Sequence, residues 1–354
     1  MIMHKSFVMK FKTISMLLLA GLLASCGDDE PTPGGGTAIQ VKMEEDRTVL
    51  IGADNGKVYN MKDGSVYVTL PGCTEITDMT MHGEDYYVTG KTTDGLMTYW
   101  MNGQTKHLGN NQGYTACISR SYDNLFVVGV ANDGLWSVYK NNNNTNISAN
   151  GTAMDIAANA ADYYAIGNGP SSGMILSSQN VPQTVRVGQY YTAIDVAVLS
   201  GAVSYYISGY NKTVVNGAET YTPCFWLKER QLSLPVNFSD KEKNQNIYKS
   251  GQALSVSHKG SDIYIAGWRS DGTNLVPTVW ITSSSNDTDD TKAYWKADGH
   301  VDAEATKTLV YGSDIYVMTV EHNLDTNTYC TRIWMNHNLK GTVNGIVGVG
   351  FVVI

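Results

Sequence analysis

Charged side chains are scarce in this sequence. They make up 16% of its 354 residues, and the acidic ones are in excess, which gives a net charge of −8. Exposed helices usually carry more charge than this, and the 22 Tyr and 35 Gly favour strands joined by polar turns. The phosphates of DNA and RNA repel a negative chain, which argues against nucleic acid as a partner.

Long apolar runs are missing after the first 25 residues. None approaches the roughly 18 residues that a membrane-spanning helix needs. The one run near the start, residues 14–24, is too short, and Lys5, Lys10 and Lys12 precede it. A basic segment followed by a short apolar one is typical of a secretory signal peptide, which we assign to residues 1–25.

Catalytic and metal-binding signatures are also few. The zinc-protease sequence H-E-x-x-H does not occur. Asp298, His300, Asp302 and Glu304 stand at every second position, so in an extended chain they would share one face and could hold a divalent ion or act as acid and base. A solvated loop that runs into a strand explains the same pattern. We therefore predict neither a metal site nor a cofactor.

The end of the signal peptide carries the most specific signal. Residues 23–26, Leu-Ala-Ser-Cys, resemble the lipobox of bacterial lipoproteins, and the resemblance implies acylation of Cys26. Several acyl chains anchor a protein stably to a membrane. Residues 26–37 follow as a tether rich in Gly and Pro. Its acidic residues 28–30 are similar to the surface-export signal of Bacteroidota lipoproteins, which implies the cell surface and outer membrane, with a solvated linker as the alternative.

A five-residue pattern, bulky strand-forming residues followed by a small one, recurs seven times. Its copies are residues 48–52, 86–90, 125–129, 163–167, 205–209, 263–267 and 315–319. Successive copies end 38 to 58 residues apart, and the last copy lacks the final Gly. A period near 40 with several strands per unit is typical of propeller blades.

Other strand signals flank each copy. An alternating stretch precedes it, a short turn joins the two, and a third strand follows. That third strand usually carries an aromatic residue: Tyr59, Trp100, Tyr139, Trp226, Trp280 and Trp334. We predict an all-β fold in which residues 38–354 form a β-propeller of seven blades with four antiparallel strands each. A β-sandwich or β-solenoid is the alternative.

The whole chain resembles Bacteroidota outer-membrane surface lipoproteins that carry a β-propeller domain. The resemblance is in the repeat and the lipobox, and it names no activity. Residues 345–354 are apolar to the last one, which is unusual for a free terminus. We predict that they pair as a strand, closing the ring against the first repeat or completing the last one.

Insertions lengthen the later repeats. They are residues 210–223, 236–252, 268–277, 283–302 and 321–329. Strand order places all five on one face, and long loops on a rigid scaffold often carry function. The ligand-binding candidates in them are Tyr210, Tyr221, Tyr248, Trp268, Tyr294 and Trp295. Flat aromatic faces stack on sugar rings and anchor protein interfaces, and we expect Trp268 and Trp295 to be accessible.

Four cysteines remain after Cys26: Cys73, Cys117, Cys224 and Cys330. They lie in separate repeats, and their spacing fixes no pairing, so we expect mostly buried thiols.

The leading functional hypothesis is a non-enzymatic lipoprotein of the cell surface. It would capture a glycan, a small molecule such as a cofactor, or a protein on the long-loop face, in the service of nutrient uptake. A propeller lyase or hydrolase of polysaccharides is the second hypothesis. An adhesive or structural module that meets another protein is the third.

Overall fold

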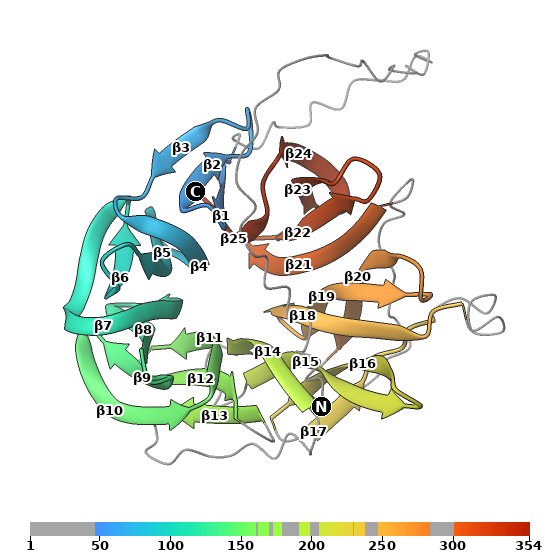
Figure 1. The fold of residues 1–354 in the computed structure, drawn as a ribbon, viewed down its shortest axis with the longest axis horizontal. Helices are drawn as coiled ribbons and strands as arrows, with labels where there is room; N and C mark the ends of the chain where they lie inside the picture. Colours follow the sequence, from blue (N-terminus) through green and yellow to red (C-terminus); the bar gives the residue numbers. More distant parts are fainter. Residues whose placement is uncertain are drawn as a thin grey trace. The chain divides into compact units, whose positions relative to one another are not determined.

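The protein is built from β-strands, and the residues that the structure describes contain no helix. The computed structural model describes residues 47–160, 162–169, 173–178, 191–198, 205–228, 230–237, 247–283 and 301–354. They belong to one compact unit, residues 45–354. No helix among them is long and apolar enough to cross a membrane. The sheets stand around a common centre as an all-β propeller, as predicted (Figure 1).

Three sheets have four antiparallel strands. In spatial order they are β25 (Gly348–Val353), β1 (Val49–Ala53), β2 (Lys57–Asn60) and β3 (Val66–Thr69); β14 (Tyr191–Val198), β15 (Tyr205–Val215), β16 (Ala218–Leu227) and β17 (Arg230–Ser233); and β21 (Val301–Tyr311), β22 (Asp314–Asn323), β23 (Thr328–Met335) and β24 (Asn338–Asn344). In each sheet the strands follow one another in sequence from the centre outwards. The exception is β25, the innermost strand of the first sheet, which comes from the end of the chain.

The other sheets have three or seven strands. The three-stranded ones are β11 (Thr152–Asn159), β12 (Asp162–Asn168) and β13 (Gly173–Ser177); and β18 (Ser250–Lys259), β19 (Asp262–Ser270) and β20 (Leu275–Ser283). The seven-stranded one comprises β4 (Cys73–His82), β5 (Asp85–Thr92), β6 (Leu96–Met101), β7 (Gln104–Ser121), β8 (Asn124–Ala131), β9 (Leu135–Lys140) and β10 (Asn143–Asn150).

The predicted seven sheets of four strands do not appear as such. The described residues form six sheets, because the long strand β7 belongs to two sets of strands. Its first residues pair with β6, and its residues from Gly113 onward pair with β8. Residues 179–190 and 284–300, which follow the two three-stranded sheets in sequence, lie outside the described part of the chain.

The seven copies of the sequence pattern all form the second strand from the centre. They lie in β1, β5, β8, β12, β15, β19 and β22. Both faces of these strands are covered: in β5, Val88 packs in one apolar cluster and its neighbour Tyr87 packs in the next one, each fully buried. Three of the predicted third-strand aromatics, Trp100, Trp226 and Trp280, are also fully buried or nearly so. Each sheet is therefore sandwiched between two neighbours, as the apolar pattern indicated.

The small residue that ends the pattern has a steric cause. Six innermost strands, β4, β7, β11, β14, β18 and β21, carry a β-bulge opposite the end of the pattern. The bulge brings a backbone carbonyl close to the second strand. A Cβ at Gly209 would overlap the carbonyl oxygen of Thr192, and a Cβ at Gly267 would overlap that of Gln252. Glycine permits this close approach.

The end of the chain closes the propeller on its first repeat. Strand β25 pairs antiparallel with β1, with Val353 opposite Val49. Thr48 and Ile354 exchange backbone hydrogen bonds of 2.9 and 2.8 Å. The prediction that residues 345–354 pair as a strand against the first repeat is confirmed.

Deleting residues 345–354 should strongly destabilise the protein. The deletion would expose the edge of β1 and uncover Ile51 and Leu50, both fully buried. We expect a large drop in melting temperature, or aggregation on size-exclusion chromatography. An unchanged melting temperature with a monomeric elution volume would contradict the closure.

Candidate functional site

Three of the predicted insertions extend β-hairpins and are not irregular loops. Strands β15 and β16 stay paired to Val215 and Ala218, β19 and β20 to Ser270 and Leu275, and β22 and β23 to Asn323 and Thr328. The prediction of long loops is wrong here, because their Thr, Val and Tyr residues favour strands despite the polar turn residues between them. These hairpins connect second to third strands, so they emerge at one end of the propeller, here called the hairpin face.

Three of the aromatic candidates meet on this face. Tyr210 of β15 and Tyr221 of β16 pack edge to face, with ring centroids 5.3 Å apart. Tyr221 packs in the same manner against Trp268 of β19, at 6.2 Å. Such T-shaped pairs add about 0.5–1.5 kcal/mol each beyond the burial of their area.

A fourth candidate lies beside them. The guanidinium of Arg269, next to Trp268 in β19, stands over the ring of Tyr248 at 3.9 Å. The backbone of Tyr248 is held on both sides by the Asn237 side chain, which accepts from its N–H and donates to its carbonyl, both at 3.0 Å. Tyr210, Tyr221, Tyr248 and Trp268, with Arg269, are here called the aromatic cluster. A cation over a tyrosine face is a favourable pair when partly desolvated.

The exposure of these residues differs from the prediction. Trp268 is only 7% exposed and Tyr210 only 4%, so the expected accessibility of Trp268 is wrong. The neighbouring hairpins cover both rings, which the sequence could not indicate. Tyr221 and Tyr248 are half-buried and present the cluster to solvent. The other two candidates, Tyr294 and Trp295, lie outside the described residues.

Polar contacts brace the β15–β16 hairpin around Tyr221. Its hydroxyl donates to the carboxylate of Glu219 at 2.5 Å, and Lys212 forms an ion pair with the same carboxylate. Burial and the Glu219 charge raise the pKa of Tyr221, so its hydroxyl remains a donor at neutral pH. Asn216 and Gly217, both at positive φ, make the tight turn that such hairpins prefer.

The weak metal and acid–base candidates are only partly described. Asp298 and His300 lie outside the described residues. Asp302 accepts the backbone N–H of Leu275 at 2.8 Å, and burial together with Asp302 raises the pKa of Glu304 to about 7. Within the described ranges, no group of three His, Cys, Asp or Glu side chains is placed to hold a metal ion.

A second cluster, which the sequence analysis missed, surrounds the propeller axis. It is formed by the residues directly after the inner-strand bulges, and here they are called the axial residues: Asp78, Cys117, Asp155, Asp195, Ser255 and Lys307. The three aspartates are 6–7% exposed. A signal existed in the sequence, since residues 152–157 and 192–197 both follow the pattern T-A-x-D-[IV]-A.

Four axial residues link their own inner strand to the neighbouring inner strand. Each accepts a hydrogen bond from a backbone N–H of the neighbouring inner strand. The donor is the residue one position after that strand's own axial residue. The bonds run from Ile118 to Asp78 (3.1 Å), Val196 to Asp155 (2.9 Å), Val256 to Asp195 (2.7 Å) and Thr308 to Ser255 (3.1 Å). Innermost strands have one edge without a ladder partner, so these side chains satisfy amides that would otherwise be buried and unpaired.

Lys307 is the basic member of the axial cluster. Its ammonium lies 3.6 Å from Asp195 and 3.9 Å from Asp78, whose strands β14 and β4 belong to different sheets. Burial opposes its charge, but Asp195, Asp78 and Asp155 outweigh burial and raise the pKa of Lys307. The axial carboxylates are therefore committed to backbone amides and to Lys307, which indicates a structural role.

The cysteines are free thiols, as expected. Cys117 and Cys224 are buried, and Cys73 and Cys330 are half-buried. Burial raises the pKa of all four thiols, which keeps them protonated and unreactive at neutral pH.

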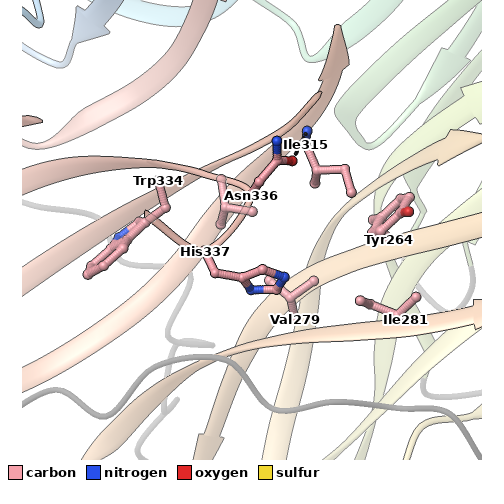
Figure 2. A pocket seen from close by; sticks show the side chains of 8 residues that line it. Tyr264, Val279, Ile281, Ile315, Trp334, Asn336 and His337 are labelled. Atoms are coloured by element: carbon pink, nitrogen blue, oxygen red, sulfur yellow. Dashed lines mark hydrogen bonds between the residues drawn. The ribbon is translucent and has the colours of Figure 1, made fainter. Parts of the chain in front are cut away.

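A small pocket lies between the β18–β20 and β21–β24 sheets. Figure 2 shows Trp334 and His337 across from Tyr264 and Ile281. Its volume of about 30 Å³ has room for about two water molecules, too little for a sugar ring or an amino-acid side chain.

One further short match has the wrong context. Residues 169–173 fit the G-x-S-x-G spacing of serine hydrolases, which the sequence analysis did not weigh. In those enzymes the serine lies between a strand and a helix. Here strand β12 ends just before the match and strand β13 begins at its last residue, so the required helix is not there.

Comparison with known proteins concerns the fold. No family model and no curated protein matches the chain. The WD40 propeller domain of Doa1 is 13% identical, over 84% of this chain and 87% of that one, with a TM-score of 0.44. The propeller domain of the trilobed protease from Pyrococcus furiosus is 8% identical, over 80% and 85%, at 0.49. A quinonprotein alcohol dehydrogenase-like protein from Bacteroides thetaiotaomicron is 10% identical, over 86% and 77%, at 0.46.

Replacing Asp195 by Ala should destabilise the protein by about 3–5 kcal/mol, because the change leaves the Val256 amide without its acceptor and removes the closer of the two carboxylates that pair with Lys307. Urea denaturation at pH 7 measures this. Asp123→Ala, on an exposed turn, is the control and should change stability by less than about 0.5 kcal/mol. Equal stability of both variants would show that the axial contacts are dispensable.

Proposed function

We propose that this protein is a non-enzymatic binding lipoprotein of the bacterial cell surface that captures a glycan on the aromatic cluster. The observation that carries the proposal is the convergence of four aromatic candidates from separate segments on one end of the propeller. Two of them, Tyr221 and Tyr248, are partly exposed, while the buried Tyr210 and Trp268 pack against Tyr221.

The chemistry around Tyr221 suits a sugar. An aromatic ring offers a flat apolar surface to the C–H groups of a pyranose. Lys212 and Glu219 stand beside the ring and can hydrogen-bond to hydroxyl groups in its plane. A binding role in nutrient uptake would use such a surface without any bond being broken.

The anchor is part of the same proposal. Residues 1–25 would be removed as a signal peptide, Cys26 would carry the lipid, and residues 26–37 would hold the propeller away from the outer membrane. The support is the lipobox sequence and the acidic residues 28–30.

We also propose that the propeller has seven blades. Seven strands, β4, β7, β11, β14, β18, β21 and β25, contact one another in a cycle around the axis. Counting β7 as the last strand of one blade and the first of the next supports this number, since its two halves pair with different strands.

One observation favours the enzymatic alternative. Glu304 has a pKa of about 7, which suits a general acid or base near neutral pH. Asp302, two residues away on the same strand, supplies a second carboxylate. The axial aspartates are less suited to acid–base chemistry, because each accepts a backbone amide.

Tyr221→Ala should weaken glycan binding by roughly ten- to a hundredfold, because one ring face contributes about 1–3 kcal/mol. Wild type and variant would be compared on a glycan array, with dissociation constants measured for each glycan that wild type binds. The matched control is Tyr122→Ala, a 67% exposed tyrosine on the turn between β7 and β8, at the opposite end of the propeller. Equal loss in both variants, or none in either with normal circular dichroism, would refute the site.

Cys26→Ala should remove the anchor. The variant should appear in the soluble fraction or keep its first 25 residues, because the acylated thiol is lost. Membrane fractionation and surface labelling of intact cells are the measurements. A variant that still fractionates with the outer membrane and is labelled at the surface would disprove the lipid anchor.

A further inference from the structure

The axial cluster contains more buried acid than base. Asp78, Asp155 and Asp195 are each at most 7% exposed. Among the described residues, the basic side chain that forms ion pairs with these aspartates is Lys307. Three carboxylates facing one ammonium would leave excess negative charge in a poorly solvated place. A proton held by one carboxylate relieves that excess.

The geometry indicates which carboxylate holds it. Lys307 forms ion pairs with Asp78 and Asp195, at 3.9 and 3.6 Å, and no ion pair with Asp155 is described. Asp155 and Asp195 occupy equivalent positions on the contacting strands β11 and β14. Each uses one oxygen for a backbone N–H, of Val196 and of Val256. The remaining oxygens can share a proton.

We propose that Asp155 is protonated at neutral pH and donates a hydrogen bond to Asp195, which makes the axial cluster a proton-dependent lock between neighbouring sheets. The proton lets two carboxylates lie together while Lys307 neutralises the ionised one. Its loss would leave two adjacent anions and push β11 and β14 apart at the axis.

The groups that face Asp155 are consistent with this lock. Asp195 on β14 has the largest electrostatic effect on Asp155 among the neighbouring charges, and Lys307 on β21, Asp78 on β4 and Cys117 on β7 also interact with it. Burial and the Asp195 charge raise the pKa of Asp155 well above its ordinary value, whereas the pKa of Asp195 is lowered: burial opposes its ionisation, but Lys307 and the hydrogen bonds it accepts outweigh burial.

The lock predicts the direction of the pH dependence. A carboxyl with a raised pKa in the folded state stabilises the fold below its unfolded pKa and loses that contribution as pH rises through the folded value. One proton released on unfolding increases the unfolding constant by up to tenfold per pH unit in this window. The window opens above the ordinary aspartate value of 3.8. The lowered pKa of Asp195 changes the stability only below pH 3.8, and the raised pKa of Lys307 changes it only above pH 10.5.

The experiment compares wild type, Asp155→Asn and the exposed control Asp123→Asn by urea denaturation from pH 5 to pH 9. An asparagine can keep both the Val196 contact and the donation to Asp195. The unfolding constant of wild type should rise with pH relative to Asp155→Asn by up to tenfold per unit, and Asp123→Asn should follow wild type. Glu304 titrates in all three proteins, so its contribution cancels in the comparison. Parallel pH profiles for wild type and Asp155→Asn would overturn the proposal.

A second measurement covers the case in which Asp155→Asn does not fold. Infrared spectra of the Glu304→Gln protein should show the C=O stretch of a protonated carboxyl at neutral pH, lost on the alkaline side. The Glu304 change removes a carboxyl whose pKa burial raises to about 7. Absence of this band at neutral pH would overturn the proposal.

Discussion

The unpaired inner edge of each sheet is the constraint on which the rest of the structure depends. A propeller leaves the innermost strand of every sheet with backbone amides that face the axis and have no partner in the ladder. Here four of the side chains that follow a bulge supply a partner, as when Asp195 accepts the Val256 amide of the next sheet at 2.7 Å. In four repeats a carbonyl of the inner strand lies against the second strand, which explains the glycine there: Gly90, Gly167, Gly209 and Gly267.

The need to satisfy the inner edges distinguishes the axial residues, which stabilise the fold, from the hairpin face, which is available to bind a ligand. The axial aspartates accept amides and face Lys307, so their position at the centre of a propeller does not make them a catalytic set. The hairpin face has the opposite character. Its hairpins extend beyond what pairing within the sheets needs, and they carry the aromatic cluster with Tyr221 and Tyr248 partly open to solvent.

The sequence predicted those features that depend on local patterns. The seven second strands, the buried aromatics of the third strands and the closing strand β25 follow from apolar alternation, which neighbouring residues determine. The insertions were visible as departures from the period, and two of them form the hairpins that carry Tyr210, Tyr221 and Trp268.

Features that depend on distant neighbours could not be predicted in this way. Tyr210 and Trp268 are buried because separate hairpins pack together, whereas their polar sequence surroundings indicated exposed loops. The axial aspartates lie tens of residues apart, from Asp78 to Asp155 to Asp195, and each looks like an ordinary polar residue in an alternating strand. The long strand β7 pairs with both β6 and β8 and so joins two repeats in one sheet, which makes the number of sheets differ from the number of repeats.

The claim that side chains at the axis join the sheets can be measured directly by amide hydrogen exchange. The amides of Ile118, Val196, Val256 and Thr308 should exchange only through global unfolding, because each is bonded to a buried side chain of the preceding inner strand. Rapid exchange of these four amides, while amides of the second strands stay protected, would contradict the account.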